Sequence, residues 1–103
     1  MKVQTVSYNA AVQTGSSPAL VMNTNVSPFN VGFGVQTTGT VTYKVQHTFD
    51  DPGVGFTTWF DHPTITGKND DQDGNYAFPV SGMRVTVTAG GGSVVMNVIQ
   101  AGI

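Results

Sequence analysis

Residues 40–50 read TVTYKVQHTFD and show the clearest alternation of apolar and polar side chains in the chain. Valine, tyrosine, histidine and phenylalanine share one face of this segment, and threonine, lysine, glutamine and aspartate share the other. Such alternation is typical of a half-buried β-strand, because successive side chains of a strand point to opposite faces. Asp51-Pro52-Gly53 follows as a turn signal. The segment therefore predicts a strand that covers one side of a hydrophobic core.

Shorter strand patterns lie on both sides of this segment. We expect strands at residues 19–22, 31–35, 57–61, 64–66, 76–80, 83–89 and 94–100, and polar loops at residues 9–18, 23–30 and 67–75. Residues 2–8 alternate weakly and predict an edge strand or an extended arm. In residues 31–35 the glycines share one face, which lets another group approach closely. Gly90-Gly91-Gly92 predicts a hairpin between the last two strands.

Composition favours strands throughout the chain. Valine and threonine are abundant, leucine occurs once, glutamate is absent, and no window has the 3.6-residue apolar period of a helix. The length of 103 residues suits one domain. We therefore predict an all-β fold over residues 1–103, a single antiparallel β-sandwich or jelly-roll-like barrel of about seven or eight short strands. Within it, residues 1–8 are the candidate N-terminal arm.

Charge is unusually sparse. Four basic residues and six aspartates make up 10% of the chain and leave a net charge of −2, whereas roughly 25% is typical of soluble domains. So few cations argue against direct nucleic-acid binding, and no apolar run has the length of a membrane span. We expect no membrane segment and synthesis in a cytoplasm, because residues 1–5 lack the apolar stretch of a signal peptide. Such a surface can be covered by protein neighbours without stranding ions.

No cofactor is expected, and the metal-site candidates are weak. Without cysteine there is no disulfide and no thiolate zinc ligand. Asn69, Asp71 and Asp73, followed by Gly74, match the beginning of a calcium-binding loop. The acidic ligand expected at the twelfth position is replaced by Val80. We therefore predict a solvated turn, with weak calcium binding as the alternative.

Catalytic patterns are equally sparse. His47 and His62 are the only imidazoles, and neither a G-x-S-x-G nor an H-E-x-x-H motif is present. Most of the aspartates lie in runs typical of turns, which disfavours a glycosidase pair. We therefore expect no enzyme and no catalytic residue, with a small hydrolase as the weakest alternative. Six aromatic residues could instead form a sugar-binding platform, although core or subunit contacts are the commoner role: Tyr43, Phe56, Trp59, Phe60, Tyr76 and Phe78.

Several segments together resemble a known class of proteins. They are residues 45–52 (VQHTFDDP), 59–63 (WFDHP), 76–80 (YAFPV) and 83–90 (MRVTVTAG), with the closing Ile99-Gln100. These segments, within residues 40–100, resemble small structural proteins encoded among the virion genes of tailed bacteriophages. The resemblance implies a virion component assembled in the host cytoplasm, foremost a capsid decoration or cement protein. It also implies binding to the major capsid protein at capsomer junctions, self-association as a dimer or trimer, and no catalytic residues.

Six residues are candidates for contacts with neighbouring subunits. We expect contacts with neighbours through Val3, Val6, Tyr8, Trp59, Phe60 and Arg84. The N-terminal three could add a strand to a neighbouring sheet. The alternatives are a head fibre, a neck or tail subunit, or a receptor- or glycan-binding module of the virion.

Overall fold

The alternating segment forms strand β5 (Val41–Thr48) in the computed structural model, which describes residues 3–11, 13–25, 29–51 and 53–100. Val41, Tyr43 and Val45 are fully buried, as the alternation predicts. β5 pairs antiparallel with β8 (Gly82–Gly90), and a β-bulge interrupts the register at Thr42/Tyr43. These two strands form the centre of one sheet.

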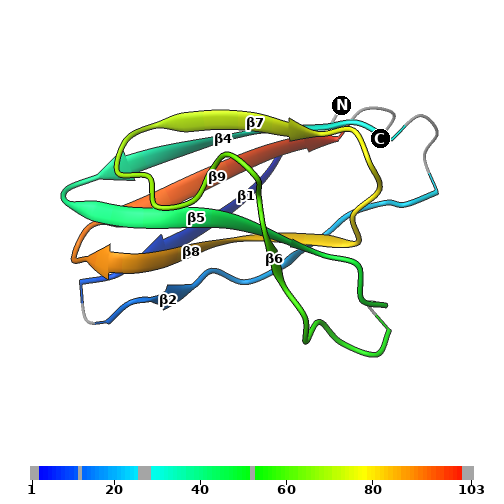
Figure 1. The fold of residues 1–103 in the computed structure, drawn as a ribbon, viewed down its shortest axis with the longest axis horizontal. Helices are drawn as coiled ribbons and strands as arrows, with labels where there is room; N and C mark the ends of the chain where they lie inside the picture. The colour runs from blue at the N-terminus through cyan, green and yellow to red at the C-terminus, as the bar shows by residue number, and fades with distance from the viewer. Residues whose placement is uncertain (1–2, 12, 26–28, 52, 101–103) are drawn as a thin grey trace.

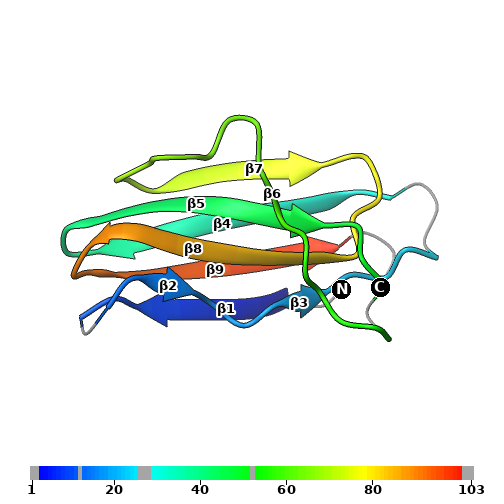
Figure 2. The same ribbon diagram turned by 60° about the horizontal axis from the view of Figure 1, so that its bottom comes forward.

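The described strands form two antiparallel sheets that face each other (Figures 1 and 2). The first sheet has the order β1 (Val3–Asn9), β9 (Ser93–Gln100), β4 (Val31–Thr38), β7 (Gln72–Tyr76). The second sheet has the order β2 (Gly15–Ser16), β8, β5, β6 (Phe60–Asp61), and β3 (Leu20–Val21) also pairs with β8. The predicted all-β sandwich is confirmed. The described part has nine strands, one or two more than expected. Three of them, β2, β3 and β6, have only two residues each.

The core lies between the inner faces of the two sheets. Valines from β4, β5, β8 and β9 line both sides, because β-branched side chains pack well on a pleated surface. The largest fully buried side chains are Tyr43, Tyr76, Ile65, Met83 and Met96. Phe33 and Val35 also face inward, while Gly32 and Gly34 face outward, as predicted. No buried polar side-chain atom among the described residues lacks a hydrogen-bond partner.

The predicted C-terminal hairpin is wrong. β8 belongs to the second sheet and β9 to the first, so the glycine turn carries the chain from one sheet to the other. Because of this crossing, the apolar faces of β8 and β9 face each other and cover the core from both sides. Two strands paired in one sheet would cover only one side of the core, and a second sheet would have to cover the other. Gly90 has a φ of +88°, and Gly92 donates its N–H to the Thr40 carbonyl (2.9 Å) and accepts from the Ala10 N–H (2.9 Å). The corner is therefore built from three chain segments.

The expected strand at residues 76–80 is displaced. β7 occupies Gln72–Tyr76, so all of it except Tyr76 lies in the segment expected to be a polar loop. Its inward residues are Gln72, Gly74 and Tyr76, which do not form an apolar alternation. A Cβ at Gly74 would lie 3.0 Å from the Phe33 ring, so the strand depends on close approach rather than on side-chain burial.

The region after the turn also forms less strand than expected. Of residues 57–61 only β6 pairs with β5, because the Thr57 and Thr58 amides bond the Asp50 carboxylate instead. Residues 64–66 form no strand, although the Ile65 carbonyl accepts a bond from the Val45 amide. The expected loop at residues 9–18 contains β2.

At the N-terminus, β1 forms the edge strand of the first sheet. It pairs with β9 from Val3↔Ile99 to Asn9↔Ser93 without a register shift. Of the two predictions for this segment, the described part adopts the edge strand. Met1 and Lys2 of the candidate arm lie outside the described residues.

Candidate functional site

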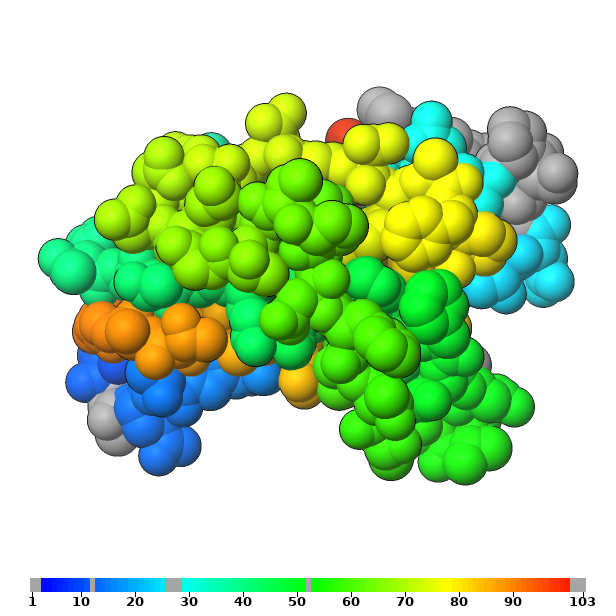
Figure 3. Space-filling view, viewed as in Figure 1, coloured from blue at the N-terminus to red at the C-terminus, as the bar shows by residue number. Residues whose placement is uncertain are grey.

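Three half-exposed phenylalanines gather at one side of the sandwich. Phe49 follows β5, Phe60 begins β6 and Phe78 follows β7, and their side chains are 55%, 48% and 45% exposed. The Phe49 ring centroid lies 5.7 Å from that of Phe60 and 6.2 Å from that of Phe78. The green segment containing β6 and the yellow segment after β7 share one face of the molecule (Figure 3). We call Phe49, Phe60 and Phe78 the phenylalanine patch.

The floor of the phenylalanine patch is His47. Its side chain is 5% exposed, and its ring centroid lies 5.4 Å from that of Phe49, 6.0 Å from that of Phe60 and 5.7 Å from that of Phe78. Nδ1 of His47 lies 2.8 Å from the Tyr76 hydroxyl. Burial lowers the His47 pKa and raises the Tyr76 pKa. Both groups are therefore neutral at neutral pH, and the patch rests on uncharged groups.

A local clamp holds the loop that carries Phe60. Asp50 accepts hydrogen bonds from the Thr57 and Thr58 amides at 2.7 and 2.8 Å. These donors hold the Asp50 pKa below its ordinary value. The Thr48 hydroxyl donates to the Thr58 carbonyl at 2.7 Å. Together these bonds return the chain to β5, so that Phe60 pairs in register with His47.

Trp59 and Arg84 meet on the second sheet, as neighbours in a cation–π contact. Cζ of Arg84 lies 4.2 Å from the Trp59 ring centroid, and the Trp59 ring meets Phe56 edge-on at 5.6 Å. Nε of Arg84 donates to Oε1 of Gln46 at 2.8 Å, which fixes the guanidinium from its other side. Burial lowers the Arg84 pKa, although an arginine stays charged in proteins. The structure therefore joins two of the predicted interface residues.

Gln46 connects this contact to an acidic neighbour. Its Oε1 also accepts from the Thr86 hydroxyl at 2.9 Å, and its Nε2 donates to Oδ1 of Asp61 at 2.9 Å. Lys44 Nζ lies 3.3 Å from the same carboxylate oxygen. The Gln46 bond, and then Lys44, lower the Asp61 pKa. This network holds Asp61 ionised beside the phenylalanine patch.

The N-terminal interface candidates lie elsewhere. Val3, Val6 and Tyr8 belong to β1, at the opposite edge of the first sheet from β7. Val3 is exposed, whereas Val6 belongs to the buried core. Tyr8 is partly buried, and its hydroxyl donates to the Gln13 carbonyl at 3.0 Å. These residues therefore do not join Trp59, Phe60 and Arg84 in one surface.

The calcium-loop candidates are placed differently from a calcium loop. Asp73 lies in β7, and Asp71 Oδ1 accepts from the Thr37 amide at 2.9 Å and from its hydroxyl at 3.2 Å. Asn69 lies before the strand. Across the described residues, no three His, Cys, Asp or Glu side chains form a group that could hold a metal ion. Asn69 and Asp71 thus precede β7 and only Asp73 lies in it, so the three residues do not share one tight turn.

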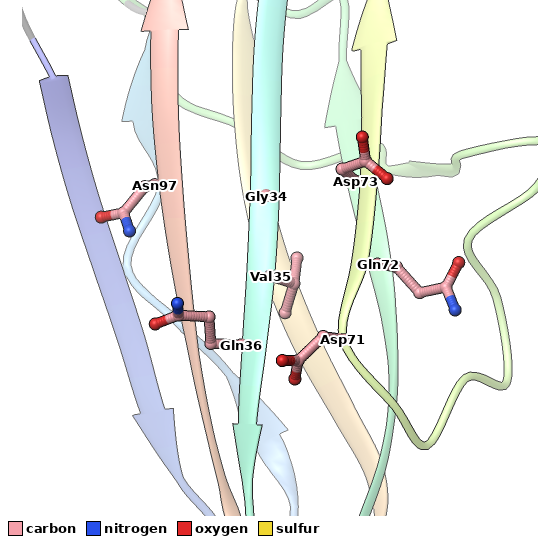
Figure 4. A pocket seen from close by; sticks show the side chains of 7 residues that line it. All are labelled: Gly34, Val35, Gln36, Asp71, Gln72, Asp73 and Asn97. Atoms are coloured by element: carbon pink, nitrogen blue, oxygen red, sulfur yellow. The ribbon is translucent and has the colours of Figure 1, made fainter.

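A shallow polar pocket of about 300 Å³ lies on the outer face of the first sheet, and sequence reasoning did not identify it (Figure 4). Its lining comes from β4, β7, β9 and the residue before β7: Gly34, Val35, Gln36, Asp71, Gln72, Asp73 and Asn97. Gly34 pairs with Asp73 on one side and with Asn97 on the other. Because glycine has no side chain, there is open space between these two polar side chains. In the sequence, only the outward-facing glycines of residues 31–35 indicate this pocket, because glycine leaves space on the face of a sheet.

The two histidines make structural contacts. His62 packs edge-on against Phe33 and Tyr76 at 5.5 and 5.1 Å, and its Nδ1 lies 3.2 Å from the Thr64 amide. His47 bonds Tyr76. Nδ1 of His62 also lies 3.3 Å from the Thr64 hydroxyl, and neither imidazole is hydrogen-bonded to a serine in the described part of the chain.

Comparison with known proteins adds no identification. No protein-family model, curated protein or solved structure matches this chain. The described part of the chain contains no helix that is both long and apolar enough to cross a membrane.

Proposed function

We propose that this protein is a structural subunit of a bacteriophage virion, a capsid decoration protein that docks on the major capsid protein through the phenylalanine patch. The main support for this docking surface is that three half-exposed phenylalanine rings lie together over the neutral His47 side chain. The resemblance of residues 40–100 to virion proteins supplies the capsid as the partner. No catalytic role is proposed.

The phenylalanine patch has the composition of an interface centre. Aromatic side chains are enriched at protein interfaces, and charged ones are depleted at their core. Its ionised neighbours already have partners, because Asp50 binds backbone amides and Asp61 binds Gln46 and Lys44. A protein surface placed over the rings therefore covers apolar atoms without stripping an unpaired ion of water.

The strength expected of this contact suits a repeated lattice. Covering the exposed half of each ring removes about 100 Å² from water, so the three rings contribute about 7 kcal/mol. The loss of translational and rotational freedom on association costs about 4–15 kcal/mol. One docking event is therefore weak by itself. Many equivalent sites on a capsid, or several copies in one oligomer, raise the overall affinity by avidity.

Sedimentation with capsids that lack the protein tests both parts of the proposal. We expect wild-type protein to pellet with capsids at micromolar concentration, and the double variant Phe49→Ala/Phe78→Ala to bind at least tenfold more weakly. Val54→Ala is the matched control, because Val54 is 85% exposed and stands outside the patch. Circular dichroism checks that each variant is folded. Wild type that fails to pellet overturns the capsid assignment, and undiminished binding by the double variant overturns the docking surface.

The polar pocket favours a second candidate, a glycan-binding module of the virion. Carboxylate and amide groups of Asp71, Asp73, Gln36 and Asn97 around an open floor at Gly34 could bind sugar hydroxyls. A glycan array, followed by Asp73→Ala/Asn97→Ala, tests it. Binding that this variant loses and the phenylalanine variant keeps, with immunogold label on the tail, would favour this candidate over decoration.

A further inference from the structure

Strand β1 presents a long unprotected edge. Among the described strands it is hydrogen-bonded only to β9, in a seven-residue register without a bulge. Its sequence, VQTVSYN, has no charged residue and no proline. Exposed edges in natural proteins are commonly blocked by lysine, proline or a bulge, because unpaired backbone groups recruit other strands. β1 has none of these devices.

The other edges of the described sheets differ from β1. At the opposite end of the first sheet, β7 carries Asp73 with Asp71 beside it. In the second sheet, β2, β3 and β6 have two residues each. Short strands and inserted charge are both means of preventing edge pairing. Figures 1 and 2 show β1 at the border of the first sheet, next to β9. Among the described edge strands, β1 is therefore the one that is both long and without charge.

The backbone groups that face the open edge can be assigned. The Ala10 amide donates to the Gly92 carbonyl on the β9 side at 2.9 Å. Successive amides of a strand point to opposite sides. The amides and carbonyls of Tyr8, Val6 and Gln4 therefore face β9. Those of the four alternate residues face outward: Val3, Thr5, Ser7 and Asn9.

We propose that a second copy of this chain pairs with β1 in antiparallel fashion, about a two-fold axis at Val6, and joins the two first sheets into one. Val6 is the central residue of β1. Pairing about it sets Thr5 opposite Ser7 and Val3 opposite Asn9, so residues with outward backbone groups meet each other. Such pairs each exchange two hydrogen bonds. With no charge in the strand, no like charges oppose each other across the axis.

This proposal goes beyond the capsid assignment and does not depend on it. The β1 edge and the phenylalanine patch lie at different sides of the sandwich, so pairing leaves the patch open. A dimer would present two patches, which strengthens attachment to a lattice by avidity. If the protein does not dimerise, the capsid proposal is unaffected, because sedimentation with capsids tests it separately.

Sedimentation equilibrium of the full chain tests the pairing. We expect a monomer–dimer equilibrium for wild type, and at least tenfold weaker association for Ser7→Pro, which removes an outward amide and keeps every bond to β9. Ser7→Ala is the matched control and should associate as wild type does. If Ser7→Pro does not fold, Thr5→Lys, which places a charge on the edge, is the substitute. A wild type that stays monomeric up to about millimolar concentration, or a proline variant that dimerises fully, overturns the proposal.

Cross-linking tests the register. The chain has no cysteine, so a single introduced thiol forms only intermolecular disulfides. Val6→Cys should cross-link on mild oxidation, because the two copies of residue 6 face each other within the Cα separation that a disulfide spans. Ser7→Cys should not, because residue 7 faces residue 5 of the other copy. The reverse result overturns the axis at Val6.

Discussion

Nδ1 of His47 and the hydroxyl of Tyr76 lie 2.8 Å apart, and they join the two sheets. His47 belongs to β5 of the second sheet, and Tyr76 ends β7 of the first. Both side chains are buried, at 5% and 1% exposure. The hydrogen bond therefore links the two sheets at the floor of the phenylalanine patch.

Stability should fall in mild acid because of His47. Burial lowers the folded-state pKa of His47 below the ordinary value of 6.5. As the pH falls through 6.5, the unfolded chain binds a proton at this residue that the folded chain does not, so the unfolding free energy decreases down to the folded-state pKa. Asp50 and Asp61, whose pKa values are lowered, contribute a similar loss only below 3.8. Urea unfolding between pH 7.5 and about 4.5 should show a smaller loss for His47→Gln, and an equal loss would contradict this account.

Tyr76→Phe should destabilise the fold at neutral pH. The substitution keeps the ring contacts with Phe33 and Phe78 and removes the hydroxyl that bonds His47. A buried nitrogen left without its partner costs about 1–3 kcal/mol. In a His47→Phe background the same change should cost much less, because the partner is already absent. Denaturant unfolding of the four proteins measures this coupling, and additive losses would show that the bond contributes nothing.

Two glycine-to-alanine substitutions should have opposite effects. Gly32 lies outside the positive-φ region and has open space where a Cβ would lie, so Gly32→Ala should stabilise by about 0.5–1 kcal/mol through the unfolded chain. Gly90 has a φ of +88°, and a Cβ there would meet the Thr40 carbonyl. Gly90→Ala should therefore destabilise by at least about 1 kcal/mol. Thermal unfolding of both variants checks this prediction, and equal effects would argue against the sheet-crossing corner.

The Gln46 side chain should matter more than an exposed hydrogen bond. Gln46→Leu removes the acceptor for Arg84 and Thr86 and the donor to Asp61, and should cost about 1–3 kcal/mol. Thr88→Val is the comparison, because it loses an exposed bond to the Thr42 carbonyl and should change stability by less than about 0.5 kcal/mol. Similar costs for the two variants would mean that the network adds little. Denaturant unfolding distinguishes the outcomes.

The fold class could be predicted from local pattern alone. The alternation at residues 41–47 places Val41, Tyr43, Val45 and His47 on one face whatever strand lies beside them, because the side-chain period of a strand is two residues. The same period placed Gly32 outward and Phe33 inward. Sparse charge likewise follows from composition and indicates a surface that neighbours can cover. None of these inferences requires knowledge of strand order.

The strand partners and the candidate site were decided by the tertiary structure. Alternation states which side chains turn inward but not which strand supplies the hydrogen bonds, so a glycine turn that crosses between sheets resembles a hairpin in sequence. β7 escaped prediction because Gly74 makes room for Phe33 instead of contributing an apolar side chain. Phe49, Phe60 and Phe78 meet only because the end of β5, the start of β6 and the end of β7 lie near one another around His47. Such contacts between segments distant in sequence depend on how two sheets bury their inner faces together, and no local period encodes them.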